Sequence, residues 1–109
     1  MKQDVEGAVF VALAEPTRRR IVRELAVQGP LTPTTLGARA GVSRQAAAQH
    51  LVVLESAGLA HGARRGREVR YELDTAAFSL AEGWMNAIRD SWDRRRSVLS
   101  RLLTDPERP

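Results

Sequence analysis

The sequence predicts a mainly helical domain with one small β-hairpin, in the order helix, helix, helix, helix, strand, strand, helix. Three observations carry this prediction. Four stretches before residue 57 have apolar residues at helical spacing and are separated by proline or glycine. Residues 68–73 alternate between apolar and polar with the period of a strand, and residues 75–103 return to helical spacing. A chain of 109 residues has the length of one ordinary domain.

The first two helices are separated by a proline. We expect the first helix from Asp4 to Leu13, because Pro16 disfavours helical conformation in the residue before it. Pro16 itself suits the first turn of a second helix, which Gly29 and Pro30 end. The apolar stripe predicted for this second helix consists of Ile21, Val22, Leu25 and Ala26.

The next two helices form a candidate helix-turn-helix at residues 32–57. Thr32 can cap a short helix that Gly41 breaks. Ser43 can cap a longer helix over residues 44–56. Two helices joined by such a short glycine-containing turn are typical of this motif.

A β-hairpin is predicted directly after the helix-turn-helix. In residues 68–73 three apolar side chains alternate with charged ones, and we expect residues 59–64 as the partner strand. Gly66 is available for the tight turn. A hairpin in this position is a wing, which we place at residues 59–73, and its tip is expected to carry Arg64, Arg65 and Arg67.

The last predicted helix covers residues 75–103, and residues 104–109 are expected to form a flexible tail. The apolar stripe of this helix is too long for one small domain to cover, which favours a homodimer. The alternative is that Trp84 and Trp92 cover the core of their own chain. The predicted dimer interface comprises Phe10, Trp84, Ile88, Trp92, Leu99 and Leu102.

Composition points to a polyanionic partner. Seventeen basic residues against thirteen acidic ones give a net charge of +4, and all but Lys2 of the basic residues are arginine. Nucleic acid fits this balance, although basic proteins also carry charge for solubility alone. The absence of cysteine excludes disulfides, thiolate metal sites and thiol nucleophiles. The N-terminal apolar run is too short and too acidic for a signal peptide or membrane span, so we expect a cytoplasmic protein.

The helix over residues 44–56 has two different sides. Its core side is predicted to hold Ala46, Ala47, His50, Leu51, Val53 and Leu54. The opposite side carries Arg44, Gln45 and Gln49, whose side chains match guanine and adenine edges in the major groove. The alternative is an ordinary surface helix. The DNA contacts predicted for the whole chain are Thr32, Ser43, Arg44, Gln45, Gln49, Arg64, Arg65 and Arg67.

Four segments in this order resemble the ArsR family of bacterial winged helix-turn-helix repressors. They are LAEPTRRRI at residues 13–21, VSRQAAAQHL at 42–51, LESAGL at 54–59 and GREVRYEL at 66–73. The resemblance covers about residues 8–73. It implies homodimers on palindromic operators and an inducer that releases the DNA.

The chain departs from the metal-sensing members of that family. It lacks the cysteines that a thiolate site requires. The metal site on the last helix of such members needs histidines paired with acidic residues, and residues 75–103 contain no histidine. His50 falls on the core side of its helix, and His61 is isolated in a wing strand. We therefore expect no metal site and no cofactor, as in the metal-independent branch of the family.

The resulting hypothesis is a sequence-specific DNA-binding regulator that acts as a dimeric repressor, with itself, double-stranded DNA and an unknown small-molecule inducer as partners. The alternative is a winged-helix module that binds protein and has no DNA specificity. An enzyme is disfavoured because the sequence shows no paired carboxylates, nucleophile–base pair or phosphate-cradling glycine loop.

Overall fold

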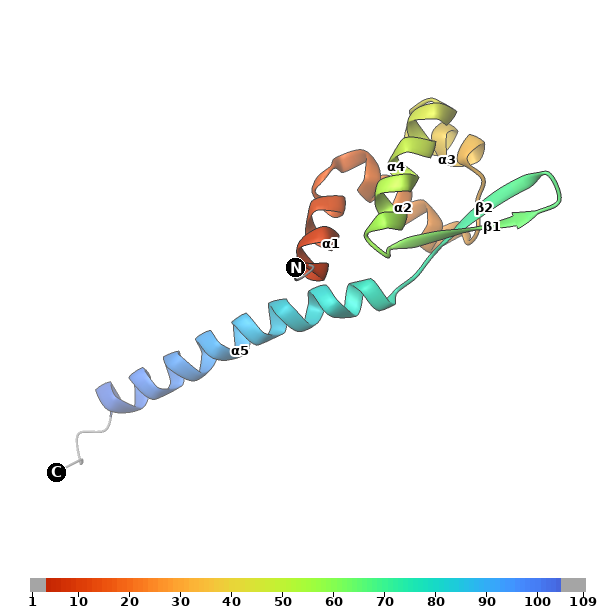
Figure 1. The fold of residues 1–109 in the computed structure, drawn as a ribbon. Coiled ribbons are helices and arrows are strands. Elements are labelled where there is room, and N and C mark those ends of the chain that lie inside the picture. Colours follow the sequence, from red (N-terminus) through yellow and green to blue (C-terminus); the bar gives the residue numbers. More distant parts are fainter. Residues whose placement is uncertain (1–3, 105–109) are drawn as a thin grey trace.

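The computed structural model describes residues 4–104 and confirms the predicted fold class. The elements are α1 (Val5–Ala14), α2 (Pro16–Gln28), α3 (Pro33–Ala40), α4 (Arg44–Ser56), β1 (Ala60–Arg65), β2 (Glu68–Leu73) and α5 (Ala76–Thr104). Figure 1 shows a compact head made of α1–α4 and the hairpin, from which α5 extends as a long rod. The molecule is accordingly elongated, at 76 × 33 × 19 Å.

The hydrophobic core lies inside the head. Its largest fully buried side chains are Val9, Ile21, Leu36, Leu51, Leu54 and Leu59. Each such side chain stabilises the fold by about 2 kcal/mol through its removal from water. The helix α5 adds the buried Ala77 and Ala81 to the core, and its Phe78 packs against that core. The predicted stripe of α2 is partly wrong, because Ala26 is exposed while Ile21 and Leu25 are buried.

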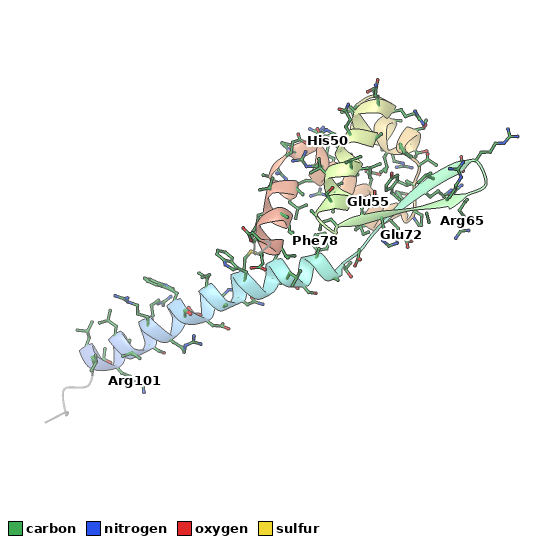
Figure 2. All side chains as sticks on the ribbon, viewed as in Figure 1. His50, Glu55, Arg65, Glu72, Phe78 and Arg101 are labelled. Atoms are coloured by element: carbon green, nitrogen blue, oxygen red, sulfur yellow. The ribbon has the colours of Figure 1, made fainter. Side chains whose placement is uncertain are left out.

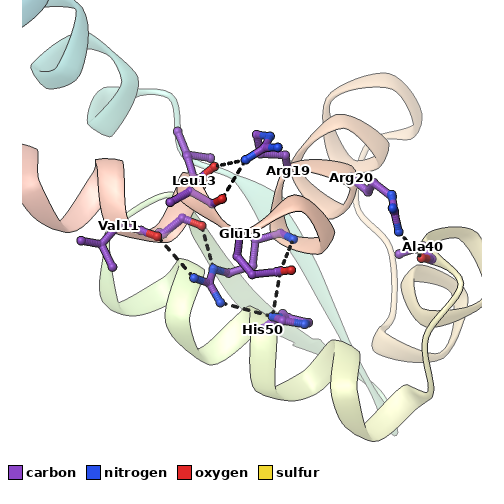
Figure 3. Close-up of polar contacts among 10 residues, drawn as sticks. Val11, Leu13, Glu15, Arg19, Arg20, Ala40 and His50 are labelled. Atoms are coloured by element: carbon purple, nitrogen blue, oxygen red, sulfur yellow. Dashed lines mark hydrogen bonds and ion pairs between the residues drawn. The ribbon is translucent and has the colours of Figure 1, made fainter.

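Arg18 and Arg19 of α2 hydrogen-bond to the C-terminal end of α1, where the two helices meet. Nε and Nη2 of Arg18 donate to the carbonyls of residues 12 and 11, at 2.6 and 3.3 Å. Nη1 of Arg19 donates to the carbonyls of residues 13 and 14, at 2.8 and 2.9 Å (Figure 3). A helix leaves its last four carbonyls without partners in the helix. In α1 the side chains of the next helix supply all four partners, and α1 runs one residue further than predicted, with Asp4 as its cap.

The caps predicted for the helix-turn-helix are confirmed. Thr32 Oγ1 accepts a hydrogen bond from the third amide of the following turn at 3.3 Å, and Ser43 Oγ does the same at 3.0 Å. Gly41 ends α3 in the left-handed conformation, with φ of 76°. The turn packs closely on α3, because a Cβ on Gly37 would lie 2.9 Å from the Val42 carbonyl oxygen. These contacts fix the direction in which α4 leaves the turn.

The wing is a two-stranded antiparallel sheet whose tip differs from the prediction. Arg65 pairs with Glu68, so only Gly66 and Arg67 form the loop, and Gly66 has φ of 62°. Arg64 and Arg65, predicted at the turn, belong to β1, which begins and ends one residue later than expected. Consecutive strand residues point to opposite faces, so these two arginines diverge.

The wing is also attached to the helix-turn-helix by a bridge that the sequence did not indicate. Leu31 and Tyr71 exchange two backbone hydrogen bonds, of 3.1 and 2.8 Å. Leu31 lies in the linker between α2 and α3, one residue before the Thr32 cap. The hairpin is therefore held against the start of α3.

The long helix α5 starts and ends one residue later than predicted. Thr104, expected in the tail, is its last residue, and the rest of the predicted tail, residues 105–109, lies outside the described residues. Every residue from 82 to 104 is exposed. Within residues 4–104, no helix is both long and apolar enough to cross a membrane.

Candidate nucleic-acid interface

The helix α4 separates a buried side from an exposed side at its N-terminal half. Ser43, Arg44, Gln45 and Gln49 are all exposed, while Ala47, Leu51 and Leu54 are buried. The predicted core side is wrong at one position, because Val53 is 37% exposed. Its place on the helix is at the margin of the buried face. The polar side chains that could address bases are thus free of the protein interior.

A groove of about 570 Å³ runs between the start of α3, the exposed side of α4 and the wing. Three predicted DNA contacts from three different elements line it: Thr32, Arg44 and Arg67. Ala48 forms part of its floor and keeps it open, since its side chain is small. The remaining lining residues are Pro33, Thr34, Thr35, Glu68, Val69 and Tyr71.

The threonines at the start of α3 were missed as a group by the sequence reasoning. Thr34 and Thr35 line the groove beside Thr32, at a helix N-terminus whose dipole favours an anion. Hydroxyl and amide donors of this kind commonly contact phosphate oxygens. The run of threonines after Leu31 was the available signal. The groove therefore combines donors for phosphate with side chains for base edges.

The wing arginines do not form one cluster. Arg64 is paired with Val69 on the face of the hairpin that is turned to the helices, and Arg67 occupies the loop beside the groove. Arg65 lies on the other face, where it lines a pocket of about 260 Å³ with Arg70 and Glu72. Figure 2 shows Arg65 at the end of the hairpin farthest from α5. The structure brings Arg67, but not Arg65, to the groove with Arg44.

His50 connects α4 to the joint between α1 and α2. Its Nδ1 lies 3.4 Å from Nη1 of Arg18 and 3.7 Å from Oε2 of Glu15 (Figure 3). Glu15 also caps α2, with Oε2 accepting from the Arg18 amide at 3.0 Å. The backbone N–H of Thr17, and then those of Arg18 and the nearby positive charges, lower the pKa of Glu15 below its ordinary value of 4.5. This cluster positions α4.

A metal centre has no obvious place in the described part of the chain. Among residues 4–104, no three His, Cys, Asp or Glu side chains come together to form a possible metal site. His61 pairs with Glu72 across the wing, at 3.0 Å between Nε2 and Oε1.

The predicted dimer residues fall into two groups. Phe10 and Trp84 meet within one protomer, edge to face, with ring centroids 5.7 Å apart. The other four lie on the part of α5 beyond this contact and are more than half exposed: Ile88, Trp92, Leu99 and Leu102.

Comparison with known proteins finds relatives that match most of this chain. A family model described as a helix-turn-helix domain matches residues 13–63. The HTH-type transcriptional regulator YuzN of Bacillus subtilis is 38% identical, over 73% of this chain and 95% of that protein. The transcriptional repressor SdpR of the same species is 30% identical, over 71% of this chain and 84% of that one. The crystal structure of an ArsR-like transcriptional regulator from a Rhodococcus strain is 34% identical, with a TM-score of 0.80 over 90% of this chain and 92% of that one.

The chain belongs to the ArsR family. As an ArsR-family protein it is a DNA-binding transcriptional regulator with a winged helix-turn-helix, in a family of regulators and not of enzymes. A further ArsR-like neighbour is a winged helix-turn-helix DNA-binding domain from Mycobacterium bovis, which is described as homodimeric. It is 25% identical, with a TM-score of 0.62 over 84% of this chain and 82% of that one. Homodimerisation is typical of the ArsR family.

Proposed function

We propose that this ArsR-family regulator is a homodimeric repressor that binds an operator with two-fold symmetry. Each protomer inserts the N-terminal half of α4 into a major groove and lays its wing on the flanking DNA. The observation that carries the proposal is the groove in which Thr32, Arg44 and Arg67 meet beside exposed Gln45 and Gln49. We propose that it acts in the cytoplasm, where bacterial DNA is found.

The proposed roles follow from side-chain chemistry. Arg44 addresses the O6 and N7 atoms of guanine, and Gln45 and Gln49 address adenine, because these pairs match in donors and acceptors. Thr32 and Ser43 each stand at a helix N-terminus, where their hydroxyls and the nearby amides suit phosphate. The three wing arginines Arg64, Arg65 and Arg67 contact the backbone or the minor groove beside the operator.

Dimerisation is assigned to α5. Its outer half exposes an apolar stripe that includes Ile88, Trp92 and Leu99, which a second copy would remove from water. A two-fold symmetric dimer would also present two copies of α4 to the two halves of a palindrome. We propose one domain over residues 1–103, with residues 32–57 reading DNA, residues 59–73 as the wing and residues 75–103 as the dimerisation helix.

We further propose that this regulator belongs to the metal-independent branch. One solved neighbour is described as an antimony-specific transcriptional repressor, AntR, at 29% identity and a TM-score of 0.57 over 77% of both chains. This chain has no cysteine to bind such a soft ion. Its two histidines pair with Glu15 and Glu72 far apart in the fold. These residues give a metal inducer no set of ligands, so we propose that the inducer is a small organic molecule.

Selection from randomised DNA duplexes tests the operator proposal. Full-length protein is expected to enrich a consensus with two-fold symmetry. Arg44→Ala and Gln45→Ala should each lower the preference for that consensus over random duplex by about 1–3 kcal/mol. Gln28→Ala, on the exposed end of α2, is the matched control. Enrichment of no sequence at moderate salt would favour the protein-binding module instead.

Sedimentation tests the assignment of the dimer to α5. Ile88→Asp places a charge in the middle of the apolar stripe and is expected to convert a dimer into a monomer, because an unpaired buried charge is costly. Glu82→Gln, also exposed on α5, should leave the dimer intact. A dimer that persists in the Ile88→Asp variant contradicts the assignment.

A further inference from the structure

A second cavity lies where α1 packs on α5, away from the DNA-facing groove. Its volume is about 430 Å³, within the range of small-molecule sites. Figure 1 shows the N-terminal end of α1 lying against the first half of α5, which is the joint that forms it. The lining residues are Asp4, Glu6, Gly7, Phe10, Trp84 and Met85.

Two aromatic rings form a corner of this cavity. The planes of Phe10 and Trp84 meet at 70°, so each ring can present a face or an edge to the space between them. Trp84 is 50% exposed, which leaves much of the indole free for a ligand. The face of an indole attracts cations through its electron density, and Met85 adds a polarisable apolar wall.

The cavity carries the opposite charge to the protein as a whole. Among residues 4–104 its lining includes the carboxylates of Asp4 and Glu6 and no basic side chain, in a chain of net charge +4. Asp4 is fixed at the rim because its Oδ1 accepts from the Gly7 amide at 2.8 Å. Gly7 permits this, since a Cβ there would collide with the Asp4 carboxylate. Aromatic rings and carboxylates together are the groups that recognise an organic cation.

We propose that this cavity binds a small organic cation with an apolar body, such as an aryl ammonium or phosphonium ion, as the effector of DNA binding. The effector role, but not the binding of the cation, rests on the proposed repressor function. A cation suits the cavity better than an apolar ligand, because an apolar ligand would strip water from Asp4 and Glu6 without supplying a partner charge.

The structure also contains a mechanical connection from this cavity to the recognition helix. The cavity lies at the first turns of α1, and the last carbonyls of α1 accept hydrogen bonds from Arg18. Arg18 in turn contacts His50 of α4 at 3.4 Å. A cation that changes the packing of α1 on α5 therefore moves α1, and the C-terminal end of α1 contacts α4 through Arg18 and His50. Such a ligand shifts DNA affinity if it binds one arrangement better than the other.

Calorimetry on the full chain, without DNA, tests the site directly with tetraphenylphosphonium as the probe. Tetraphenylborate, of the same shape and opposite charge, is the matched control ligand. We expect one phosphonium per chain and much weaker binding of borate. Trp84→Ala should weaken phosphonium binding about tenfold and Glu6→Gln several-fold. Glu82→Gln, on the same helix outside the cavity, should leave phosphonium binding unchanged.

Titration of the selected duplex with and without tetraphenylphosphonium then tests the effector role. A several-fold change in duplex affinity that Trp84→Ala abolishes supports it. Phosphonium binding with no change in duplex affinity overturns the effector role, and no phosphonium binding overturns the site. Binding confined to the Ile88→Asp variant also overturns it, because a second copy then fills the cavity. Failure of the protein to bind any duplex without phosphonium would instead overturn the proposed repressor function, and the calorimetry would stand independently.

Discussion

The arginines of the α1–α2 joint and those of the wing are alike in chemistry but opposite in use. Arg18 and Arg19 donate hydrogen bonds to the carbonyls that end α1. Within residues 4–104, no hydrogen bond or ion pair joins the guanidinium groups of Arg64, Arg65 or Arg67 to another side chain or carbonyl. Net charge counts both groups equally. Only the second group is free to meet phosphate.

This difference teaches that the basic composition overstates the DNA-binding surface. A guanidinium that already bonds two carbonyls gives up those hydrogen bonds if it turns to phosphate, and for Arg18 the part-buried carbonyl of residue 12 is then left unsatisfied. The wing arginines have no such cost. The two groups should therefore respond differently to removal: a less stable fold at the joint and a weaker affinity for DNA at the wing.

The largest expected effect is on stability at the joint. Arg18→Ala removes hydrogen bonds to two α1 carbonyls and the contact with His50, and should lower the free energy of unfolding by about 2 kcal/mol. Chemical denaturation followed by circular dichroism measures this. Arg23→Ala, an exposed arginine on the same helix, is the control and should change stability by less than about 0.5 kcal/mol. Equal effects would erase the distinction between the two groups.

A smaller effect is expected at the wing, and on affinity instead of stability. Arg67→Ala should weaken binding to specific and random duplexes alike, and reduce the slope of log affinity against log salt by about 0.9 for each phosphate that is no longer neutralised. Arg70→Ala is the control in the same hairpin, because Arg70 is already paired with Glu68 at 3.2 Å. A change in melting temperature with unchanged salt slope would place Arg67 among the structural arginines.

The fold and much of the candidate site could be predicted because local signals are strong in this sequence. Thr32 and Ser43 are caps that bond their own backbone within three residues, so short-range chemistry is enough to find them. The exposed position of Gln45 and Gln49 follows from helical periodicity alone. These features require no knowledge of what lies across the fold.

What could not be predicted depends on contacts between distant residues. The Leu31–Tyr71 bridge joins segments forty positions apart, and nothing in either segment names the other. Arg64 and Arg65 point to opposite faces of the hairpin, and which face each one takes depends on the strand register. A shift of the turn by one residue would exchange the two faces. The contact of Arg18 with His50 likewise needs the packing of α2 on α4. The sequence showed arginines at the α1–α2 joint and in the wing, but not which of them hydrogen-bond to the rest of the protein.

The smallest expected effect concerns acid stability at the joint. The pKa of Glu15 is lowered in the folded protein, so the ionised carboxylate stabilises the fold at pH values above 4.5, the ordinary pKa of the group. This contribution is lost as the pH falls through the lower pKa of the folded state. Glu15→Gln should therefore be less stable than wild type at neutral pH, with the gap closing below pH 4.5. Thermal unfolding across pH 3–7 (roughly the carboxylate range) measures it. A gap that is constant with pH would assign the loss to capping alone.

The uncovered length of α5 has a consequence for how the amount of this protein controls its activity. A chain that has not met a partner leaves residues 82–104 open to water. Pairing rises with the square of chain concentration, so scarce chains would remain single and abundant ones would be paired. The outer half of α5 would then set a threshold copy number below which its target genes stay on.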